Sequence, residues 1–385
     1  MIVAVDTNCI LPGQVGGIEN YTLGLIEALK LPQSPAKKVI LLTRPENHSL
    51  FAAFEDDRTR IVLLERANGN WQELQKQDPV AAQKALGEFQ RRKRDALHRQ
   101  HVDLVHFPGN TINPIDLDLP VVLNLHDLQH RHFPQYFSDE EIDVREKWWV
   151  MSGRRAEALI AGSSFIRDDL CAQLGVDPSK IFVTPDVFQA TFFRRPAASK
   201  LTAVRRKFRL PEIFFLYPAA AWPHKNHPRL IQAFESAAVP GAQLVLTGAG
   251  HTGPAPAENV RFLGRVGTDD LVAMYCLATA LIFPSLYESW SIPIMEAMAC
   301  GCPVASSNVT SLPEQVADAG LLFDPLDIKS MAETIEQLAT DQALRQKLST
   351  NGKIRVREFS ETNFVQTIAR AYQFATAAHQ AKRAA

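Results

Sequence analysis

The chain has 385 residues, which is too long for one ordinary domain and indicates two or three. Hydrophobic residues make up 46% of it and charged residues 22%, as in ordinary soluble globular proteins. The formal net charge of −1 gives no support for a nucleic-acid partner or for a broadly membrane-seeking surface, so we expect neither.

The cysteines and the absence of long apolar runs indicate a cytosolic setting. The five cysteines are odd in number and lack the spacing of a metal site. Cys300-Gly-Cys302 lies in a packed turn, where we expect reduced, structural thiols. No apolar run reaches the roughly 18 residues that a membrane-spanning helix needs. The chain opens on a strand pattern rather than a signal peptide, so we expect a cytoplasmic protein.

The first strand is expected at residues 2–6, which are apolar up to a final aspartate. A loop follows, then the pair Gly16-Gly17, and then a helix over residues 21–29. A glycine pair before a helix allows the close backbone approach that a phosphate group requires. A simple turn also uses glycine pairs, so this pair alone leaves both interpretations open.

Further short apolar runs alternate with helical segments in the first half of the chain. We expect strands at residues 39–43, 60–64, 102–107, 120–125, 158–161 and 181–184. Ser163 and Ser164 are placed to cap a helix that Gly175 ends. This alternation predicts a parallel, doubly wound sheet. Residues 189–211, with two prolines and mixed charges, are typical of an interdomain connection.

A long polar segment at residues 71–100 interrupts this alternation and is expected to be helical. It contains the basic cluster Arg91-Arg-Lys-Arg94. The simpler interpretation is a solvated helix face. The alternative is contact with anionic lipid headgroups, which would suit a lipid-linked substrate.

Several possible metal ligands follow the strand at residues 120–125, namely His126, Asp127, His130 and His132. His130 and His132 are too close together on a loop to make a persuasive metal site. We therefore expect no metal ion at this position.

The second half begins again with a strand at residues 213–217 and a helix at residues 229–236. Lys225 lies just before that helix. A cation at a helix N-terminus can meet a diphosphate that the helix also attracts. A lysine at this position is more often simply solvated. A further strand is expected at residues 243–247.

The most informative stretch is residues 281–307, which predict a strand, a loop, a helix and another strand. Glu288 lies in the loop and Glu296 early in the helix, with seven residues between them. Free N–H groups at Ser291 and Ile292 would attract a phosphate. Carboxylates beside such a site suit sugar or ribose hydroxyls, whose hydrogen bonds to charged groups contribute about 1.5–3 kcal/mol each. The alternative is that Glu288 is solvated and Glu296 supports its helix dipole.

This stretch resembles the donor-binding signature of the retaining glycosyltransferases of family 4, which have the GT-B fold. The signature pairs two glutamates across seven residues and adds a tail of small residues. The matching positions are Glu288, Pro293, Glu296, Ala297, Ala299, Gly301, Pro303 and Val304. Trp290 and Ser291 depart from it, because Phe and Gly are usual there. A serine β-carbon narrows the approach of the backbone to a ligand, which affects the geometry of the donor pocket.

The resemblance gives the candidate residues specific roles. It implies that Gly16 and Gly17, followed by Glu19, touch the donor phosphate from the first half of the chain. It implies that His126 lies near the anomeric centre of the donor sugar. The family's phosphate-binding Lys-Asn pair falls on Lys225 and Asn226.

In the same way, the resemblance assigns Glu296 to the ribose hydroxyls and Glu288 to a hydroxyl of the donor sugar. It adds the Ser291 and Ile292 amides to the donor site. The family often has an arginine a few residues before the lysine, where this chain has only alanines at 219–221. His224 or Arg265 is a candidate replacement for that missing cation.

The resemblance covers nearly the whole chain and implies its organisation. We expect an N-terminal Rossmann-like acceptor domain over residues 1–200 and a C-terminal nucleotide-sugar domain over residues 201–361. Residues 362–385 are expected to form a helix that crosses back to the first domain. The implied GT-B fold is α/β, with two doubly wound parallel sheets facing each other across a cleft.

The implied activity is retaining transfer of a hexose from a nucleoside diphosphate sugar, without metal or other cofactor. The acceptor is expected to be a glycan or a lipid-linked saccharide in cell-surface polysaccharide synthesis, and the enzyme either cytoplasmic or peripheral at the inner membrane. The donor is GDP-mannose, suggested by similarity to mannosyltransferases, or a UDP-sugar. The rival hypotheses are a non-catalytic GT-B subunit that binds a nucleotide sugar, and a sugar phosphorylase or epimerase on the same fold.

Overall fold

A computed structural model describes residues 1–13, 16–65, 74, 76–186, 190–250 and 257–384. The chain forms two compact units. The first comprises Met1–Val187 together with Glu361–Ala385, and the second comprises Phe188–Ser360.

The first unit is built on a seven-stranded parallel sheet with the order β3-β2-β1-β4-β5-β6-β7. Its strands are β1 (Ile2–Asp6), β2 (Lys38–Thr43), β3 (Thr59–Leu63), β4 (Leu104–Phe107), β5 (Val121–Asn124), β6 (Ala158–Ala161) and β7 (Ile181–Val183). β1, β4, β5 and β6 are almost wholly apolar and buried, as expected for parallel strands that are covered on both faces. The predicted doubly wound sheet is confirmed.

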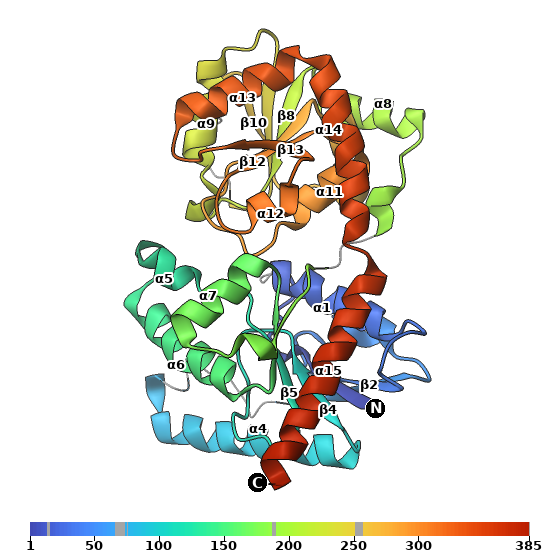
Figure 1. Ribbon diagram of the computed structural model, residues 1–385, viewed down its shortest axis with the longest axis vertical. Helices are drawn as coiled ribbons and strands as arrows, with labels where there is room; N and C mark the ends of the chain where they lie inside the picture. Colours follow the sequence, from blue (N-terminus) through green and yellow to red (C-terminus); the bar gives the residue numbers. More distant parts are fainter. Residues whose placement is uncertain (14–15, 66–73, 75, 187–189, 251–256, 385) are drawn as a thin grey trace. The chain divides into compact units, whose positions relative to one another are not determined.

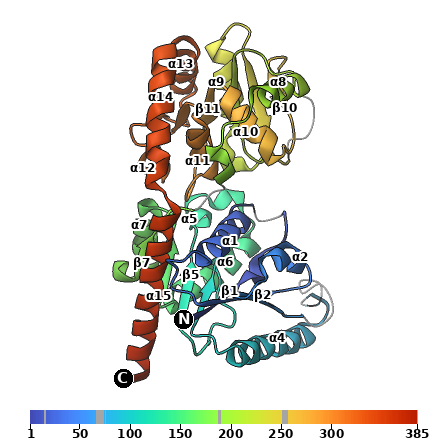
Figure 2. The same ribbon diagram turned by 90° about the vertical axis from the view of Figure 1, so that its right-hand side faces the viewer.

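Helices cover this sheet (Figure 1). They are α1 (Gly16–Leu29), α2 (His48–Phe51), α4 (Pro79–Arg99), α5 (Gln129–His132), α6 (Asp139–Arg155), α7 (Ser164–Leu174) and α15 (Glu361–Ala384). The caps predicted for α7 are present, because the Ser163 hydroxyl accepts from the Ile166 N–H and Gly175 ends the helix in a left-handed conformation. α15 packs along β5, β6 and β7 (Figure 2) and buries Phe364 and Tyr372 in the core of this unit.

The second unit has a six-stranded parallel sheet with the order β10-β9-β8-β11-β12-β13. Its strands are β8 (Phe214–Pro218), β9 (Gln243–Thr247), β10 (Val260–Phe262), β11 (Ala280–Phe283), β12 (Val304–Ser307) and β13 (Gly320–Phe323). Its helices are α8 (Ala198–Lys207), α9 (His227–Ala237), α10 (Thr268–Leu277), α11 (Ile292–Cys300), α12 (Leu312–Val316), α13 (Ile328–Thr340) and α14 (Gln342–Arg355). Figure 1 shows α9 and α13 on one side of the sheet and α8, α11 and α14 on the other.

The division between the units differs from the boundary expected at residue 200. Phe192 and Val204 are buried in the core of the second unit, so the segment expected to be a connection belongs largely to that unit. α8 forms there because a run without glycine or proline separates Pro196 from Pro211. A second difference from the prediction concerns α1, which begins at Gly16 rather than at Tyr21.

Candidate functional site

The candidate site of the second unit lies where its strand order reverses. β8 and β11 are neighbours at the centre of the sheet, and the chain leaves them toward opposite edges. In doubly wound sheets, ligands bind outside the carboxyl ends of the strands at this point. Lys225 follows β8 and Glu288 follows β11, so the topology brings the two predicted residues to one place.

The loop after β8 is held rigidly by its own polar groups. Asn226 is 1% exposed and lies in the left-handed region at φ +59°. Its amide nitrogen donates to the carbonyls of Pro284, at 3.1 Å, and Pro325, at 2.8 Å. The Tyr217 hydroxyl donates to the Lys225 carbonyl at 2.9 Å. Asn226 therefore holds the loop in place. Its side chain is not free to bind a donor, and in this respect the role expected for it requires correction.

Lys225 and Glu288 form an ion pair with 2.6 Å between Nζ and Oε1. Their side chains are only 19% and 10% exposed, so the pair is largely shielded from water. The Lys225 ammonium also lies 5.7 Å from the centre of the Phe283 ring. Glu288 is therefore not the solvated carboxylate of the simpler interpretation. The predicted phosphate cation and the predicted sugar-binding carboxylate neutralise each other in this state.

A short turn after β12 clamps the Glu288 backbone on both sides. The Glu288 N–H donates to the Thr310 hydroxyl at 3.2 Å, and the Ser311 hydroxyl donates to the Glu288 carbonyl at 3.0 Å. Thr310 has φ +55°, a conformation that β-branched residues rarely adopt and that costs about 1–3 kcal/mol. Sequence reasoning missed this clamp, because it joins two loops that are 22 and 23 residues apart.

At the N-terminus of α11, one of the two N–H groups predicted to bind a phosphate already has a hydrogen-bond partner. The Ser291 N–H donates to the Gln315 side-chain oxygen at 3.0 Å, and the Gln315 amide donates back to the Ser291 carbonyl at 2.6 Å. The Ser291 hydroxyl caps the helix by accepting from the Ile294 N–H. The prediction of the Ser291 amide as a phosphate donor is therefore wrong in this structure. The Ile292 N–H has no hydrogen-bond partner among the described residues.

Trp290, which departs from the family signature, serves packing. It is 7% exposed, and its ring meets the Phe359 ring edge to face at 5.0 Å between centroids. The bulky residue therefore anchors the loop to the end of α14 and the turn after it.

Glu296 projects from the second turn of α11 toward Tyr275 of α10. The Tyr275 hydroxyl donates to its Oε2 at 3.0 Å. Burial raises the pKa of this carboxyl from 4.5 to about 7, and the tyrosine hydrogen bond opposes that rise only in part. A carboxyl that is half-protonated near neutral pH, beside the switch point, is typical of a functional position.

Replacing Glu296 by glutamine should raise the melting temperature at pH 8 but leave it nearly unchanged at pH 5. Because the folded-state pKa is raised above 4.5, the buried neutral carboxyl is most favourable below that pH. This contribution is lost as the pH rises through about 7. It corresponds to no more than about 3.5 kcal/mol, because the pKa rises from 4.5 to about 7 at about 1.4 kcal/mol per pKa unit.

Thermal melts of both proteins at pH 5 and pH 8 check this expectation. Glu333→Gln on α13, whose side chain is 63% exposed, is the control. An equal shift at both pH values would contradict the buried ionisation.

In the first unit, His126 follows β5 and is held by two hydrogen bonds. Its backbone N–H donates to the Asn110 side chain at 2.8 Å, and its Nε2–H donates to the Pro108 carbonyl at 2.7 Å. The Tyr21 ring meets it edge to face at 5.5 Å. With Nε2 engaged as a donor, Nδ1 is the ring nitrogen that is left for a further hydrogen bond.

Asp186 is a neighbour of His126 that sequence reasoning missed. It follows β7 at the same carboxyl edge of the sheet, and the half-buried carboxyl interacts electrostatically with His126. Burial raises the pKa of Asp186 to about 6, and the histidine opposes this rise. The signal available in the sequence was the position of an aspartate just after a predicted strand.

The remaining predicted residues of this unit are Gly16 and Gly17, which form the first turn of α1 rather than a loop before it. A β-carbon on Gly17 would meet nothing within 4 Å, so the space beside it is open. Glu19 accepts from the Gly13 N–H at 2.8 Å and ties the preceding loop to the helix.

A small polar cavity of about 100 Å³ lies at the switch point of the first sheet, between the carboxyl ends of β1 and β4. Lys93 of α4 is 1% exposed there and binds Asp6 at 2.5 Å and the Asn113 carbonyl at 2.7 Å. Phe89, Phe107 and Thr111 also line the cavity. The basic cluster is therefore not one solvated face, because Lys93 points inward while Arg91 and Arg92 are exposed.

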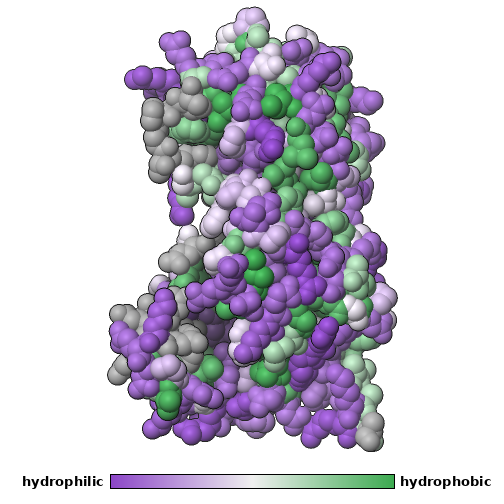
Figure 3. Space-filling model, turned by 90° about the vertical axis from the view of Figure 1, so that its left-hand side faces the viewer, coloured by the Kyte–Doolittle hydropathy of each residue, from purple (hydrophilic) through white to green (hydrophobic). Residues whose placement is uncertain are grey.

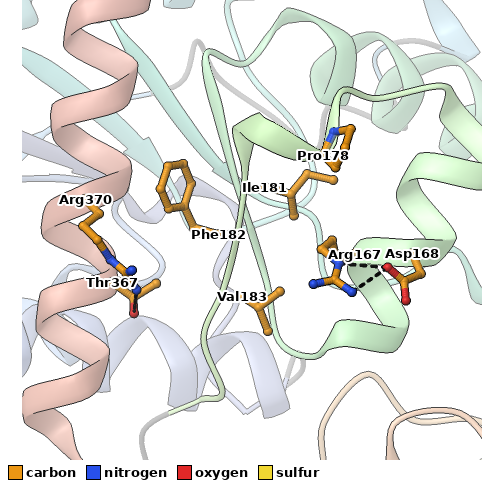
Figure 4. Close-up of a pocket in the computed structure, with 8 residues that line it drawn as sticks. All are labelled: Arg167, Asp168, Pro178, Ile181, Phe182, Val183, Thr367 and Arg370. Atoms are coloured by element: carbon orange, nitrogen blue, oxygen red, sulfur yellow. Dashed lines mark hydrogen bonds and ion pairs between the residues drawn. The ribbon is translucent and has the colours of Figure 1, made fainter.

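A larger cavity of about 530 Å³ lies beside β7, the edge strand of the first sheet (Figure 4). Arg370 and Thr367 of α15 lie on one side of the strand, and the Arg167–Asp168 ion pair of α7 lies on the other. None of the predicted site residues lines this cavity, and we assign the chemistry to the carboxyl edges of the sheets.

The other histidines after β5 have separate partners. His130 meets Glu146 at 3.1 Å, and His132 meets Asp169 at 2.9 Å. Across the described ranges, no group of three or more His, Cys, Asp or Glu residues is arranged to hold a metal ion. No helix in the described part of the chain is long and apolar enough to cross a membrane, and hydrophilic residues cover much of the face shown in Figure 3.

Two family profiles match the chain in succession. Residues 15–186 match the profile described as Glycosyltransferase Family 4, and residues 202–355 match Glycosyl transferases group 1. The O-antigen chain mannosyltransferase B of Escherichia coli is 29% identical over 290 residues, which cover 71% of this chain and 75% of the relative. The O-antigen chain mannosyltransferase RfbU of Salmonella typhimurium is 26% identical over 228 residues, covering 56% of this chain and 60% of the relative.

Among solved structures, Anabaena HepE in complex with UDP-glucose superposes with a TM-score of 0.73. It is 18% identical, and the match covers 96% of this chain and 98% of HepE. This likeness concerns the fold. The two parallel sheets and this likeness show the GT-B fold. The two profiles, which together span most of the chain, and the O-antigen relatives show that the chain is a glycosyltransferase and belongs to family 4.

Proposed function

We propose that this glycosyltransferase moves a hexose from a nucleoside diphosphate sugar to a glycan or lipid-linked saccharide, with retention at the anomeric carbon. The observation that carries the proposal is the shielded Lys225–Glu288 pair at the switch point of the second unit. A single diphosphate sugar offers an anion for the lysine and hydroxyl donors for the carboxylate. The diphosphate can therefore take the place of Glu288 beside Lys225, and a sugar hydroxyl can take the place of Lys225 beside Glu288.

The donor is proposed to lie along α11. Glu296 accepts hydrogen bonds from the ribose hydroxyls, and the Ile292 N–H and Lys225 meet the diphosphate. Negative charge builds on the leaving diphosphate as the sugar becomes oxocarbenium-like, and these donors are already in place when it does. We also propose that Gly16 and Gly17 touch the donor phosphate. The proposed transfer needs no metal ion.

The acceptor is proposed to bind the first unit beside His126. The histidine orients the donor sugar, and the leaving phosphate takes the proton of the acceptor hydroxyl. The polar cavity at Asp6, Lys93 and Thr111 provides hydrogen-bonding groups next to the Phe89 and Phe107 rings. A saccharide, which has both hydroxyls and an apolar ring face, suits that lining.

Mannose is the proposed sugar and GDP-mannose the proposed donor. Two relatives named as O-antigen chain mannosyltransferases support this choice and a role in surface-polysaccharide synthesis. A UDP-sugar is the alternative, supported by the likeness in fold to HepE, whose structure holds UDP-glucose. We further propose a cytoplasmic enzyme, which the five free cysteines support. We also propose that Arg91 and Arg92, which are exposed, contact the inner membrane surface.

Incubation of the full chain with radiolabelled GDP-mannose, UDP-glucose or UDP-galactose, with and without methyl α-mannoside, tests the proposal. We expect labelled sugar to be transferred to the mannoside, and the donor to be consumed only when the mannoside is present. The product should be α-linked, like the sugar in the donor. Product NMR reads the anomeric configuration. Binding of GDP or UDP without any turnover would instead indicate a non-catalytic subunit. Consumption of donor that requires inorganic phosphate would indicate a phosphorylase.

A further inference from the structure

Two cysteine thiols of the second unit lie together next to the proposed nucleotide site. Cys276 is the penultimate residue of α10, and Cys300 is the last residue of α11. The Cys276 thiol donates to the Cys300 carbonyl oxygen at 3.9 Å, which places the two cysteines side by side. The adjacent residue on α10, Tyr275, bonds Glu296 one turn earlier on α11. Two neighbouring contacts, Tyr275 with Glu296 and Cys276 with Cys300, therefore join the two helices.

The two thiols have unequal environments. Cys276 is partly exposed, and its interaction with the Cys300 side chain, helped by Arg195 and Lys353, lowers its pKa to about 7. Cys300 is 8% exposed, and its interaction with Cys276 and its burial raise its pKa, so it stays protonated. Its thiol also lies 3.4 Å from the Phe192 carbonyl. A partly exposed thiolate beside a buried thiol is the arrangement found in peroxide-reactive cysteine pairs.

We propose that Cys276 is a peroxide-reactive modification site, with Cys300 as the resolving cysteine that converts it to a disulfide joining α10 to α11. The Cys276 thiolate attacks one oxygen of hydrogen peroxide. The O–O bond breaks, hydroxide leaves, and a sulfenic acid forms. The Cys300 sulfur then attacks the Cys276 sulfur and loses its proton as water leaves. Two thiols are oxidised by two electrons, and the peroxide is reduced to two molecules of water.

The other three cysteines do not offer this arrangement. Cys302 is 2% exposed, its thiol donates to the Pro303 carbonyl at 3.5 Å, and burial raises its pKa. Cys9 lies just after β1 in the first unit and has no cysteine partner among the described contacts. Cys171 lies in α7 of the first unit and has no cysteine partner among the described contacts.

The disulfide would act on the helix that carries Glu296. Sulfur atoms in a disulfide are about 2.05 Å apart, closer than two unbonded sulfur atoms can approach, so the bond draws the ends of α10 and α11 together. This consequence rests on the proposed nucleotide site, whereas the disulfide itself does not. We expect oxidation to change the affinity for the nucleotide product, GDP or UDP, at least threefold and reversibly.

Treatment of the full chain with stoichiometric hydrogen peroxide tests the assignment. Titration with Ellman's reagent in denaturant should fall from five free thiols to three. The intact mass should drop by about 2 Da, and peptide mapping should find the Cys276–Cys300 link. Cys300→Ser should instead trap a sulfenic acid on Cys276 that dimedone labels. Cys300→Ala is the second variant should the serine disturb the packing.

Cys171→Ser and Cys302→Ser serve as controls and should oxidise like the parent. Five remaining thiols, or a disulfide that uses any other cysteine, would overturn the proposal. GDP and UDP titrations before and after oxidation test the coupling separately. Unchanged affinity with the disulfide formed would refute the coupling alone, and no nucleotide binding in either state would refute the proposed site.

Discussion

Replacing Lys225 by alanine should lower kcat/KM about 10²- to 10³-fold, the loss typical when one preorganised group that stabilises transition-state charge is removed. The loop that presents Lys225 is fixed by the buried Asn226 amide and by the Tyr217 hydroxyl, so the ammonium is held in position before the donor arrives. The chain also lacks the arginine usual before this lysine, which leaves Lys225 with a larger share of the diphosphate charge.

The loss should appear in kcat as well as in nucleotide affinity, because the charge on the diphosphate grows during the reaction. Steady-state kinetics and GDP or UDP titrations separate these two effects. Lys329→Ala on α13, whose side chain is 84% exposed, is a matched control and should behave like the parent. Parent-like kcat/KM in Lys225→Ala would remove the lysine from the mechanism.

Replacing Glu288 by glutamine should lower kcat/KM about 10- to 100-fold, as expected for losing the charge from a hydrogen bond worth about 1.5–3 kcal/mol. The affinity for the free nucleotide should not fall with kcat/KM. Glutamine no longer neutralises Lys225, which lies 2.6 Å away, so GDP or UDP should bind as tightly as before or more tightly. This opposition distinguishes Glu288 from Lys225.

A double-mutant cycle over Lys225→Ala and Glu288→Gln measures the coupling between the two side chains. Glu314→Gln, in the nearby helix α12, is the control for the loss of one negative charge. Weaker nucleotide binding in Glu288→Gln, equal to that of Lys225→Ala, would show that the pair acts only as a structural support.

The sequence predicted the backbone of the site well because its signals are local. The local order is as predicted: strand β11, a proline at the start of α11, a glycine that ends the helix, and strand β12. The positions of Lys225 and Glu288 then followed from the rule that parallel strands share a carboxyl edge. Their direct contact was not predicted, because it depends on the conformations of two loops that are 63 residues apart.

The errors concern hydrogen bonds between distant segments. Nothing local to Ser291 shows that Gln315 occupies its N–H, and nothing local to Asn226 shows that its amide bonds two carbonyls from other loops. The expected boundary at residue 200 moved because Phe192 and Val204 find their apolar partners in the second unit. Such pairings are properties of the packed structure, and a pattern of single residues does not contain them.

A crystal structure of the full chain with its nucleotide sugar shows whether Lys225, Glu288 and Glu296 hold the donor. We expect a diphosphate oxygen about 3 Å from the Lys225 Nζ, a donor-sugar hydroxyl on Glu288 and the ribose hydroxyls on Glu296. A nucleotide sugar bound elsewhere, with the contact between Lys225 and Glu288 intact, would contradict this expectation.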